Sequence, residues 1–260
     1  RLEIITFNVG NADAFLVKTP QNKYVAIDTG KSGYNGGKSQ AEYIILKYMR
    51  DKGIKNLEAL VITHFDNDHS GGAVDMMKNL RVKKVYINSK NVSSKTSHEI
   101  MDYLNSGKQD FAIARNDNEI YSESGLTIQT YIANLETDNE NSIITLLKYK
   151  DFEMLFMGDA GIEAFRKVSA DFPGNIEVFK AGHHGAANVA DKDLIEKINP
   201  AVSVISTGKN NYGHPNKATL DVLRHSDIYR TDRNNSIKIA TDGCEYLIQT
   251  YDSIARKYIM

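Results

Sequence analysis

The sequence predicts an α/β fold built as one domain over residues 1–260, and two observations carry this prediction. Short apolar runs rich in β-branched and aromatic residues recur along the whole chain, bounded by Gly, Asn and Asp. Amphipathic stretches of helical length separate several of these runs. No Ser- or Pro-rich linker interrupts the series, and 260 residues with 41% hydrophobic side chains suffice for one large core.

The individual elements follow from these patterns. Strands are expected at residues 4–7, 15–17, 24–27, 60–62, 85–87, 143–147, 154–157, 176–179, 202–205, 237–239 and 246–248. Helices are expected at residues 39–52, 71–79, 97–106, 160–169, 191–198 and 216–225. Ser39 is a suitable N-cap for the first helix, and Pro215 stands near the start of the last, where its fixed φ is tolerated. The Asn- and Asp-rich stretch 134–142 is expected to be a loop.

The balance of charge bears on the partners of the chain. Its 32 basic and 33 acidic residues give a formal net charge of -1. A protein that grips nucleic acid mainly through phosphates is usually more basic. The basic run 81–84 is either a local patch or a solvated turn between elements, and the turn is the commoner case. Charge therefore neither identifies DNA as a partner nor excludes it.

Other features narrow the class of protein. A single cysteine, Cys244, excludes an internal disulfide and a cysteine-rich zinc site. No apolar run reaches about eighteen residues, so the chain is not expected to span a membrane. The chain begins with Arg1 and reads as a strand from residue 2, which suggests that a leader or a preceding segment has been removed. The sequence does not indicate an oligomeric state.

Four potential metal ligands lie within one short loop that follows the predicted strand at 60–62. His64 and Asp66 alternate along an extended backbone, so their side chains can point to the same side. Asp68 and His69 follow where the loop turns toward the next helix, and they can face a second position. Two such positions suit a pair of metal ions. Helix capping would explain one acidic residue here but not two histidines and two aspartates together, so a metal site is favoured.

Two further predicted strands end in residues of the same kind. The strand at 154–157 leads into Asp159, and the strand at 176–179 leads into His183 and His184 between two glycines. A lone aspartate after a strand is often only a helix N-cap. Adjacent histidines between glycines are harder to explain that way, because glycine lets the backbone approach a site closely. Three strand ends that supply His and Asp groups indicate a site at one edge of a packed sheet.

Other motifs in the sequence give weaker evidence of function. The Gly-Lys-Ser triplets at 30–32 and 37–39 lack the upstream glycine that a phosphate-binding loop requires. No serine lies in a G-x-S-x-G elbow, so serine hydrolase chemistry has no support. His98 and His225 are expected at the surface of helices. His214 precedes a proline in a glycine-containing loop, and it either lines the site or stands apart from it.

These residues resemble a known family. His64-x-Asp66-x-Asp68-His69 resembles the H-x-H-x-D-H motif of the metallo-β-lactamase superfamily, and Asp28 resembles the family's early strand-end aspartate. Residues 7–13 resemble the D-V-G-Q-G-D segment that opens the hydrolase domain of ComEC-type DNA-uptake proteins. Further similarities to that subgroup are Asn141-Ser142, Gly158-Asp159-Ala160, His183-His184-Gly185, Tyr212-Gly213-His214-Pro215 and Arg230-Thr231-Asp232-Arg233. The resemblance runs from residue 4 to about 240 and implies a four-layer α/β/β/α metallo-β-lactamase sandwich with metals at one edge of its two sheets.

The resemblance also implies roles for individual residues. His64, Asp66 and Asp159 would hold one ion, while Asp68, His69, His184 and the shared Asp159 would hold the other. His184 is preferred to His183 as the ligand, which leaves His183 to contact the substrate or the leaving group. Asp13, retained from the opening motif, either orients a ligand histidine or is a turn carboxylate.

Two departures from the family pattern concern the first metal position. Asp66 stands where the family has its second motif histidine, and a further mid-chain histidine has no counterpart, with Asn141-Ser142 near its place. The first position is therefore rich in oxygen and short of nitrogen. Because oxygen ligands favour harder ions, we expect a weaker, exchangeable first site that tolerates Mn²⁺ as well as Zn²⁺, with one or two ions bound in all.

The expected chemistry is hydrolysis by a metal-activated water. Asp68 is the carboxylate expected to matter most after Asp159, and His183 or His214 could protonate or stabilise the leaving group. A phosphodiesterase ranks first, and the ComEC resemblance implies a nuclease that acts on DNA. The alternatives are a hydrolase of a lactone, thioester or β-lactam, and a binding module with a vestigial site. The ComEC resemblance implies an extracytoplasmic position, whereas the composition fits a free-standing cytoplasmic hydrolase equally well.

Overall fold

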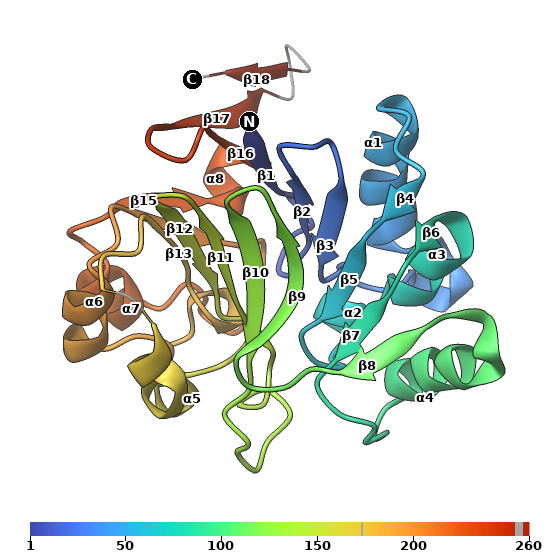
Figure 1. The fold of residues 1–260 in the computed structure, drawn as a ribbon. Coiled ribbons are helices and arrows are strands. Elements are labelled where there is room, and N and C mark those ends of the chain that lie inside the picture. The colour runs from blue at the N-terminus through green and yellow to red at the C-terminus, as the bar shows by residue number, and fades with distance from the viewer. Residues whose placement is uncertain (173, 253–256, 260) are drawn as a thin grey trace.

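The computed structural model describes residues 1–172, 174–252 and 257–259, and their strands form two large sheets. The order of the nine-stranded sheet is β18-β17-β16-β1-β2-β3-β5-β7-β8 (Figure 1). Its strands are β1 (Leu2–Thr6), β2 (Phe15–Lys18), β3 (Tyr24–Ile27), β5 (Ala59–Ile62), β7 (Val85–Ile87), β8 (Phe111–Ile113), β16 (Ile237–Thr241), β17 (Tyr246–Asp252) and β18 (Lys257–Ile259). The strands from β3 to β8 run parallel, and the others pair antiparallel.

The seven-stranded sheet has the order β15-β14-β13-β12-β11-β10-β9. Its strands are β9 (Asn118–Glu123), β10 (Leu126–Tyr131), β11 (Ile144–Tyr149), β12 (Phe152–Phe156), β13 (Val178–Lys180), β14 (Val202–Ile205) and β15 (Asp227–Arg230). The strands from β12 to β15 are parallel, and the strands from β9 to β12 are antiparallel. Two short strands, β4 (Asn56–Leu57) and β6 (Arg81–Val82), form a separate parallel pair.

Helices cover the outer face of each sheet. Along the first half of the chain lie α1 (Leu46–Asp51), α2 (Asn67–Ser70), α3 (Ala73–Asn79) and α4 (Lys95–Tyr103). Along the second half lie α5 (Ile162–Val168), α6 (Lys192–Ile198), α7 (Lys217–Val222) and α8 (Thr231–Asn234). Single turns of π-helix at Ala41–Ile45 and Leu104–Lys108 extend α1 and α4, and 3₁₀ turns occur at Tyr34–Gly36, Ser169–Asp171 and His183–Gly185.

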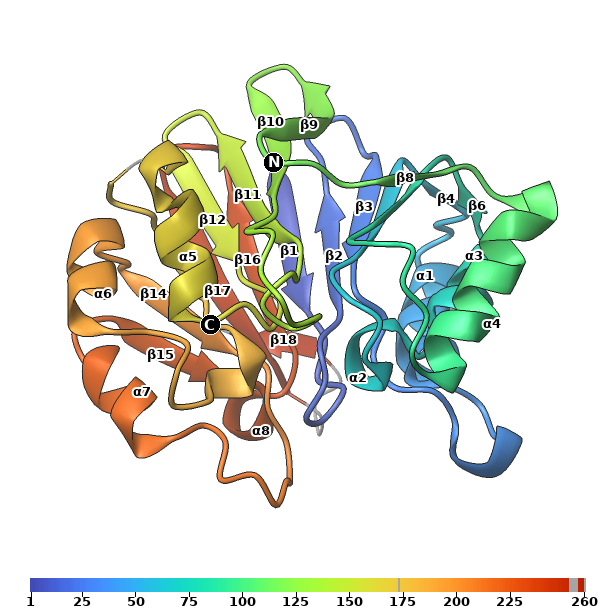
Figure 2. The same ribbon diagram turned by 90° about the horizontal axis from the view of Figure 1, so that it is seen from below.

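Three buried hydrophobic clusters define the layers. One lies between the sheets, where the rings of Phe15 and Phe156 meet edge to face with centroids 5.1 Å apart. The second joins the nine-stranded sheet to α1, α3 and α4, and the third joins the seven-stranded sheet to α5, α6 and α7. Because side chains alternate along a strand, Ile4 packs between the sheets while Ile5 faces the helices. The result is the predicted α/β/β/α sandwich, with α1, α3 and α4 on one side and α5, α6 and α7 on the other (Figures 1 and 2).

Most elements lie where the sequence predicts them. All six predicted helices are present, although the first begins with a π-helical turn, and residues 134–142 contain neither helix nor strand. The strands β4, β6, β8, β9, β10, β15 and β18 were not anticipated. The run 81–84 is exposed apart from Val82, but it is not a simple turn, because its first two residues form β6. No helix in the described part of the chain is long and apolar enough to cross a membrane.

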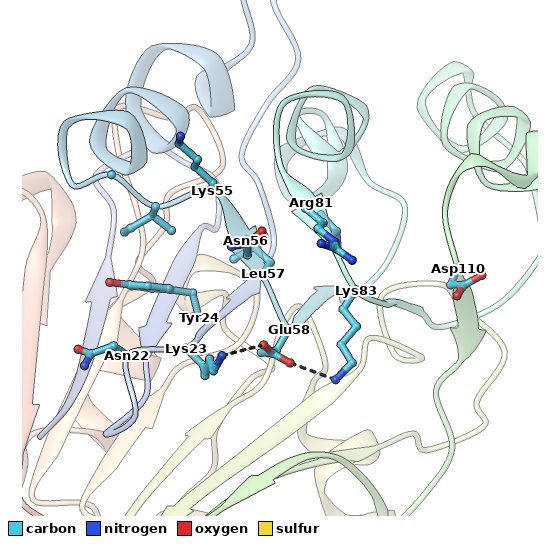
Figure 3. Close-up of a pocket in the computed structure, with 13 residues that line it drawn as sticks. Asn22, Lys23, Tyr24, Lys55, Asn56, Leu57, Glu58, Arg81, Lys83 and Asp110 are labelled. Atoms are coloured by element: carbon cyan, nitrogen blue, oxygen red, sulfur yellow. Dashed lines mark hydrogen bonds and ion pairs between the residues drawn. The ribbon is translucent and has the colours of Figure 1, made fainter.

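The same basic run borders a hollow of about 690 Å³ at the end of the nine-stranded sheet where β3 and β5 begin (Figure 3). Glu58 lies between two lysines there, 4.0 Å from Lys23 and 3.3 Å from Lys83. The predicted metal ligands follow the opposite ends of these strands. This hollow is therefore remote from the candidate site.

Candidate metal centre

The candidate site lies where parallel strands of both sheets end. The chain leaves β5 through Thr63 and His64, and α2 then carries Asp68 and His69. Asp159 follows β12, and His184 follows β13 across the interface between the sheets. Figure 2, the view from below, looks toward this edge of the sandwich. Carboxyl ends of parallel strands share one edge of a sheet, which is why residues distant in sequence meet here.

Four buried polar atoms at the centre of the site have no hydrogen-bond partner among the described residues. They are His64 Nε2, His69 Nε2, His184 Nε2 and Asp159 Oδ1. His69 Nε2 approaches Asp159 Oδ1 to 3.0 Å, but in an orientation that makes no hydrogen bond. Two ligands about 2 Å from one ion lie about 3–3.5 Å apart, so this spacing suits a shared cation. Buried unpaired polar atoms are costly, and a divalent ion would satisfy all four.

The orientation of two imidazoles leaves the correct nitrogen free. His184 Nδ1–H donates to the carbonyl oxygen of Ser206 at 2.9 Å, and His69 Nδ1 lies 2.7 Å from Asp28 Oδ2. Histidines that bind metals commonly donate their other N–H to a carbonyl or a carboxylate in this way. Asp28 also accepts from the backbone N–H and the hydroxyl of Thr63. Both rings are therefore fixed with Nε2 facing the cluster.

The surroundings of His64 differ. Its Nδ1 lies 3.1 Å from Thr63 Oγ1 and 3.2 Å from Ser142 Oγ, and its Nε2 lies 3.6 Å from Asp66 Oδ2 and 3.8 Å from Asp159 Oδ2. Ser142 Oγ also accepts the backbone N–H of Asp159. The serine near the place of the missing mid-chain histidine thus braces two of the candidate ligands.

Two groups of residues could each hold an ion. His64, His69 and Asp159 form one, and Asp68, His69 and His184 form the other, with ligand atoms in each group within 4.8 Å of one another. His184 Nε2 lies 3.5 Å from Asp68 Oδ2. Asp66 reaches His64, but its side chain is 53% exposed, so it stands at the mouth of the site. The chemistry and burial of this donor set fit a divalent metal ion.

Electrostatics of the protein without a bound cation point the same way. Burial favours the protonated form of Asp68, but the His184 and His69 imidazoles lower its pKa to about 2. Burial opposes the charge on His69, while Asp159 and Asp28 raise the pKa of this ring well above its usual value. The pKa of Asp159 is well below its ordinary value despite burial, chiefly because of His69 and then His184. The carboxylates and imidazoles of the cluster thus stabilise one another's charged forms when no cation is bound.

The backbone at His183 and His184 is unusual. His183 and His184 have φ values of 43° and 52°, a conformation that costs non-glycine residues of order 1–3 kcal/mol each. The flanking glycines allow the close packing that holds it. A Cβ on Gly182 would lie 2.4 Å from the carbonyl oxygen of Ala160, and one on Gly185 would lie 2.7 Å from Pro215 Cβ. The glycines that drew attention in the sequence are thus sterically required.

His183 and His214 lie at the rim of the cluster. The side chain of His183 is 37% exposed, and its Nε2 is 3.7 Å from Asp159 Oδ2. The rings of His183 and His214 are 5.4 Å apart, centroid to centroid. Partial burial, and then the nearby His183 and His184, lower the pKa of His214. The structure therefore brings every sequence-predicted site residue to this edge, while His98 and His225 are exposed away from it.

One participant was missed by the sequence analysis. Lys180, the last residue of β13, is fully buried, and its ammonium group donates to Asp13 and, at 3.0 Å, to the carbonyl oxygen of Gly158. Asp13 in turn lies 3.6 Å from His184 Nδ1 and 3.8 Å from His69 Nδ1. Lysine is rarely buried unless it is paired, so a lysine at the end of an apolar strand was the available signal.

The fold and this buried His/Asp cluster together define a class of protein. The family model of the metallo-β-lactamase superfamily matches residues 7–209, and the chain belongs to that superfamily. It has the architecture and the donor cluster of a metal-dependent hydrolase of this superfamily.

More specific similarities extend over most of the chain. It is 29% identical over 252 residues to ComE operon protein 3 of Bacillus subtilis, which covers 91% of this chain and 32% of that protein. It is also 29% identical over 225 residues to Recombination protein 2 of Haemophilus influenzae, covering 85% of this chain and 26% of that protein. The chain thus spans about a third or less of these relatives. Among solved structures, CmlA, a diiron β-hydroxylase from Streptomyces venezuelae, has a similar fold, with a TM-score of 0.61, 13% identity, and coverage of 92% of this chain and 54% of that one.

Proposed function

We propose that the chain is a metal-dependent phosphodiesterase that cleaves nucleic acid strands. The observation that carries the proposal is the convergence of three imidazole nitrogens and one carboxylate oxygen, all buried and unpartnered in the described structure, beside two further acidic residues. Similarity to a competence operon protein and a recombination protein favours nucleic acid as the substrate class. Extension of their roles to this chain is part of the proposal.

The donor set also bears on the choice of metal. His69 lies within reach of both positions; when it is counted with His184 and Asp68, the position around His64 keeps one imidazole and the carboxylates of Asp66 and Asp159. Oxygen-rich positions suit Mn²⁺, and nitrogen-rich positions suit Zn²⁺. We propose a second position that holds Zn²⁺ or Mn²⁺ and a first position that exchanges its ion and accepts Mn²⁺. Equilibrium dialysis that showed two zinc ions retained against excess manganese would contradict this assignment.

Residues of this chain would have separate roles in the hydrolysis. A bound divalent ion would supply an acidified water and stabilise developing negative charge. Asp68, ionised above a pKa of about 2, is able to accept the hydrogen bond that orients the attacking water. His214, whose pKa is lowered by burial and by the nearby imidazoles, would protonate the leaving oxygen or stabilise it by hydrogen bonding. His183, exposed beside Asp159, would contact the same oxygen.

The test compares substrates on one metal-loaded protein. We would strip the purified chain, reload it with Mn²⁺ or Zn²⁺, and assay a chromogenic phosphodiester, single-stranded DNA, a lactone and a β-lactam, with Asp68→Ala as the control. Cleavage of the diester and of DNA that is lost in Asp68→Ala is the expected result. Hydrolysis of the lactone or β-lactam alone would replace the proposed activity, and inactivity with both metals would indicate a vestigial site.

A further inference from the structure

A second hollow, lined by residues of polar type, adjoins the rim of the metal centre. Its volume is about 550 Å³, and it is lined by Asn11, Lys31, Lys209, Asn210, Asn211 and Tyr212. It is connected to the cluster by a series of rings. Tyr212 lies 5.8 Å from His214 and His214 lies 5.4 Å from His183, measured between ring centroids. The hollow therefore begins one side chain away from the histidines proposed to face the leaving group.

Two lysines in this hollow lack a counter-ion. Within the described residues, neither Lys31 nor Lys209 has a carboxylate within 4 Å, although several other lysines of the chain form ion pairs. Lys31 follows Gly30, whose N–H donates to the backbone carbonyl of Asp13. Lys209 follows Gly208, which packs so tightly on Gly10 that a Cβ there would lie 2.6 Å from its backbone. Both lysines are thus carried by segments fixed against the site, with free positive charge.

Tyr212 is exposed on a braced loop. Its side chain is 75% exposed, which is unusual for a large aromatic residue. Asn210 holds the loop on both sides: its Oδ1 accepts from the N–H groups of Tyr212 and His214, and its Nδ2 donates to the carbonyls of Gly208 and His214. All four hydrogen bonds of this amide are used within the loop. The flat ring is therefore presented to solvent by an ordered segment.

The geometry points to a subsite for the strand that flanks the scissile phosphate, in which Lys31 and Lys209 bind a neighbouring phosphate and Tyr212 stacks on an unpaired base. This inference rests on the proposed phosphodiesterase function and names its substrate as single-stranded nucleic acid. Positive side chains that follow the backbone, together with aromatic rings that accept bases, are the usual means of binding such strands. A duplex offers no free base face to Tyr212, because its bases are stacked on each other.

The chain supplies matched controls for each residue. Lys55 is a lysine that borders the remote hollow in Figure 3, and Lys55→Ala removes the same charge as Lys209→Ala at the other end of the sheet. Tyr43 is 63% exposed on the helical face that precedes α1, and Tyr43→Ala removes a comparable ring. If the substitutions act only through net charge or exposed area, each subsite variant and its control should change oligonucleotide binding equally.

The experiment measures binding of a labelled single-stranded oligonucleotide by fluorescence anisotropy, in chelator so that no cleavage occurs, over a series of salt concentrations. We expect Tyr212→Ala to weaken binding at least about fivefold, the lower end of one base stack. Lys31→Ala and Lys209→Ala should each reduce the slope of log affinity against log salt by about 0.7, one phosphate contact. Lys55→Ala and Tyr43→Ala should change neither the affinity nor the salt slope. Tyr212→Ala should have little effect on the affinity for a duplex.

The outcomes separate the subsite from the proposed activity. Equal effects of Lys209→Ala and Lys55→Ala, or of Tyr212→Ala and Tyr43→Ala, would overturn the subsite, as would absence of binding by the unsubstituted chain. Hydrolysis of the small diester with oligonucleotide binding that is insensitive to all three subsite variants would overturn the subsite and leave the phosphodiesterase intact. Selective loss of binding in a protein that cleaves no diester would support the subsite and refute the activity.

Discussion

Replacement of Lys180 by methionine tests the buried ion pair beneath the metal centre. Lys180→Met keeps most of the length and apolar volume of the side chain but removes the ammonium group. The change leaves the carboxylate of Asp13 fully buried without its cation, and the carbonyl of Gly158 without its donor. Water cannot compensate readily, because both side chains of the pair are inaccessible.

The expected cost follows from that burial. Removal of one partner from a buried ion pair destabilises a protein by about 3–5 kcal/mol, because the remaining charge stays desolvated. An exposed pair contributes only about 0–1 kcal/mol. Lys47 and Asp51 provide such a pair in the same chain, with 3.0 Å between Nζ and Oδ2 and side chains that are 66% and 62% exposed. Lys47→Met is therefore the control, and it should cost at most about 1 kcal/mol.

The assay is urea unfolding of metal-free protein, followed for Lys180→Met, Asp13→Asn and the double variant. Both single changes should lower the free energy of unfolding, and the double variant should recover part of the loss, with a coupling energy of about 2 kcal/mol or more. Additive effects, or a cost for Lys180→Met no larger than that for Lys47→Met, would show that Asp13 and Lys180 do not depend on each other.

Three further predictions concern the cluster and its frame. Asp28→Asn should weaken metal binding about 10–100-fold in a chelator competition, because the amide no longer fixes the ring of His69 as a carboxylate does; unchanged affinity would contradict this role. Asp68 has a lowered pKa, so its stabilisation is present above pH 3.8 and is lost as the pH falls toward 2; the metal-free protein should lose about 2 kcal/mol over this range, and Asp68→Asn should lose less. Gly182→Ala should destabilise by about 1–3 kcal/mol in thermal or urea unfolding, whereas Gly174→Ala, where the nearest atom would be 3.5 Å away, should be mild; equal effects would refute the steric argument.

The sequence predicted the interior of the fold better than its margins. Buried strands such as β5 and β7 are continuous apolar runs, so composition alone predicts them. The hairpin of β9 and β10 and the edge strand β15 have polar residues on one face, and in the sequence they resemble loops. Their pairing is decided by neighbouring strands, which a local pattern does not contain.

The candidate site shows the same division. The cluster of ligand types in residues 64–69 is local, so it could be read directly, and Asp159 and His184 could be placed because each follows a predicted strand. Lys180 could not be placed in this way. The apolar strand before it hints at burial, but its partner, Asp13, is 167 residues away, and nothing near Lys180 in sequence identifies that partner. The role of Ser142 was missed for the same reason, since it depends on contact with His64, 78 residues away.

The division of the donor set between the two halves of the chain couples metal binding to assembly of the fold. His64 comes from the nine-stranded sheet, and Asp159 and His184 come from the seven-stranded sheet. An ion held by His64 and Asp159, or one held by Asp68 and His184, would link the two sheets at one edge, and an unfolded chain would not present either donor set. Such an ion at a hundredfold excess over its dissociation constant would add about 2.7 kcal/mol to the stability of the folded state. The availability of metal would therefore regulate the stability of the folded chain as well as its proposed hydrolytic activity.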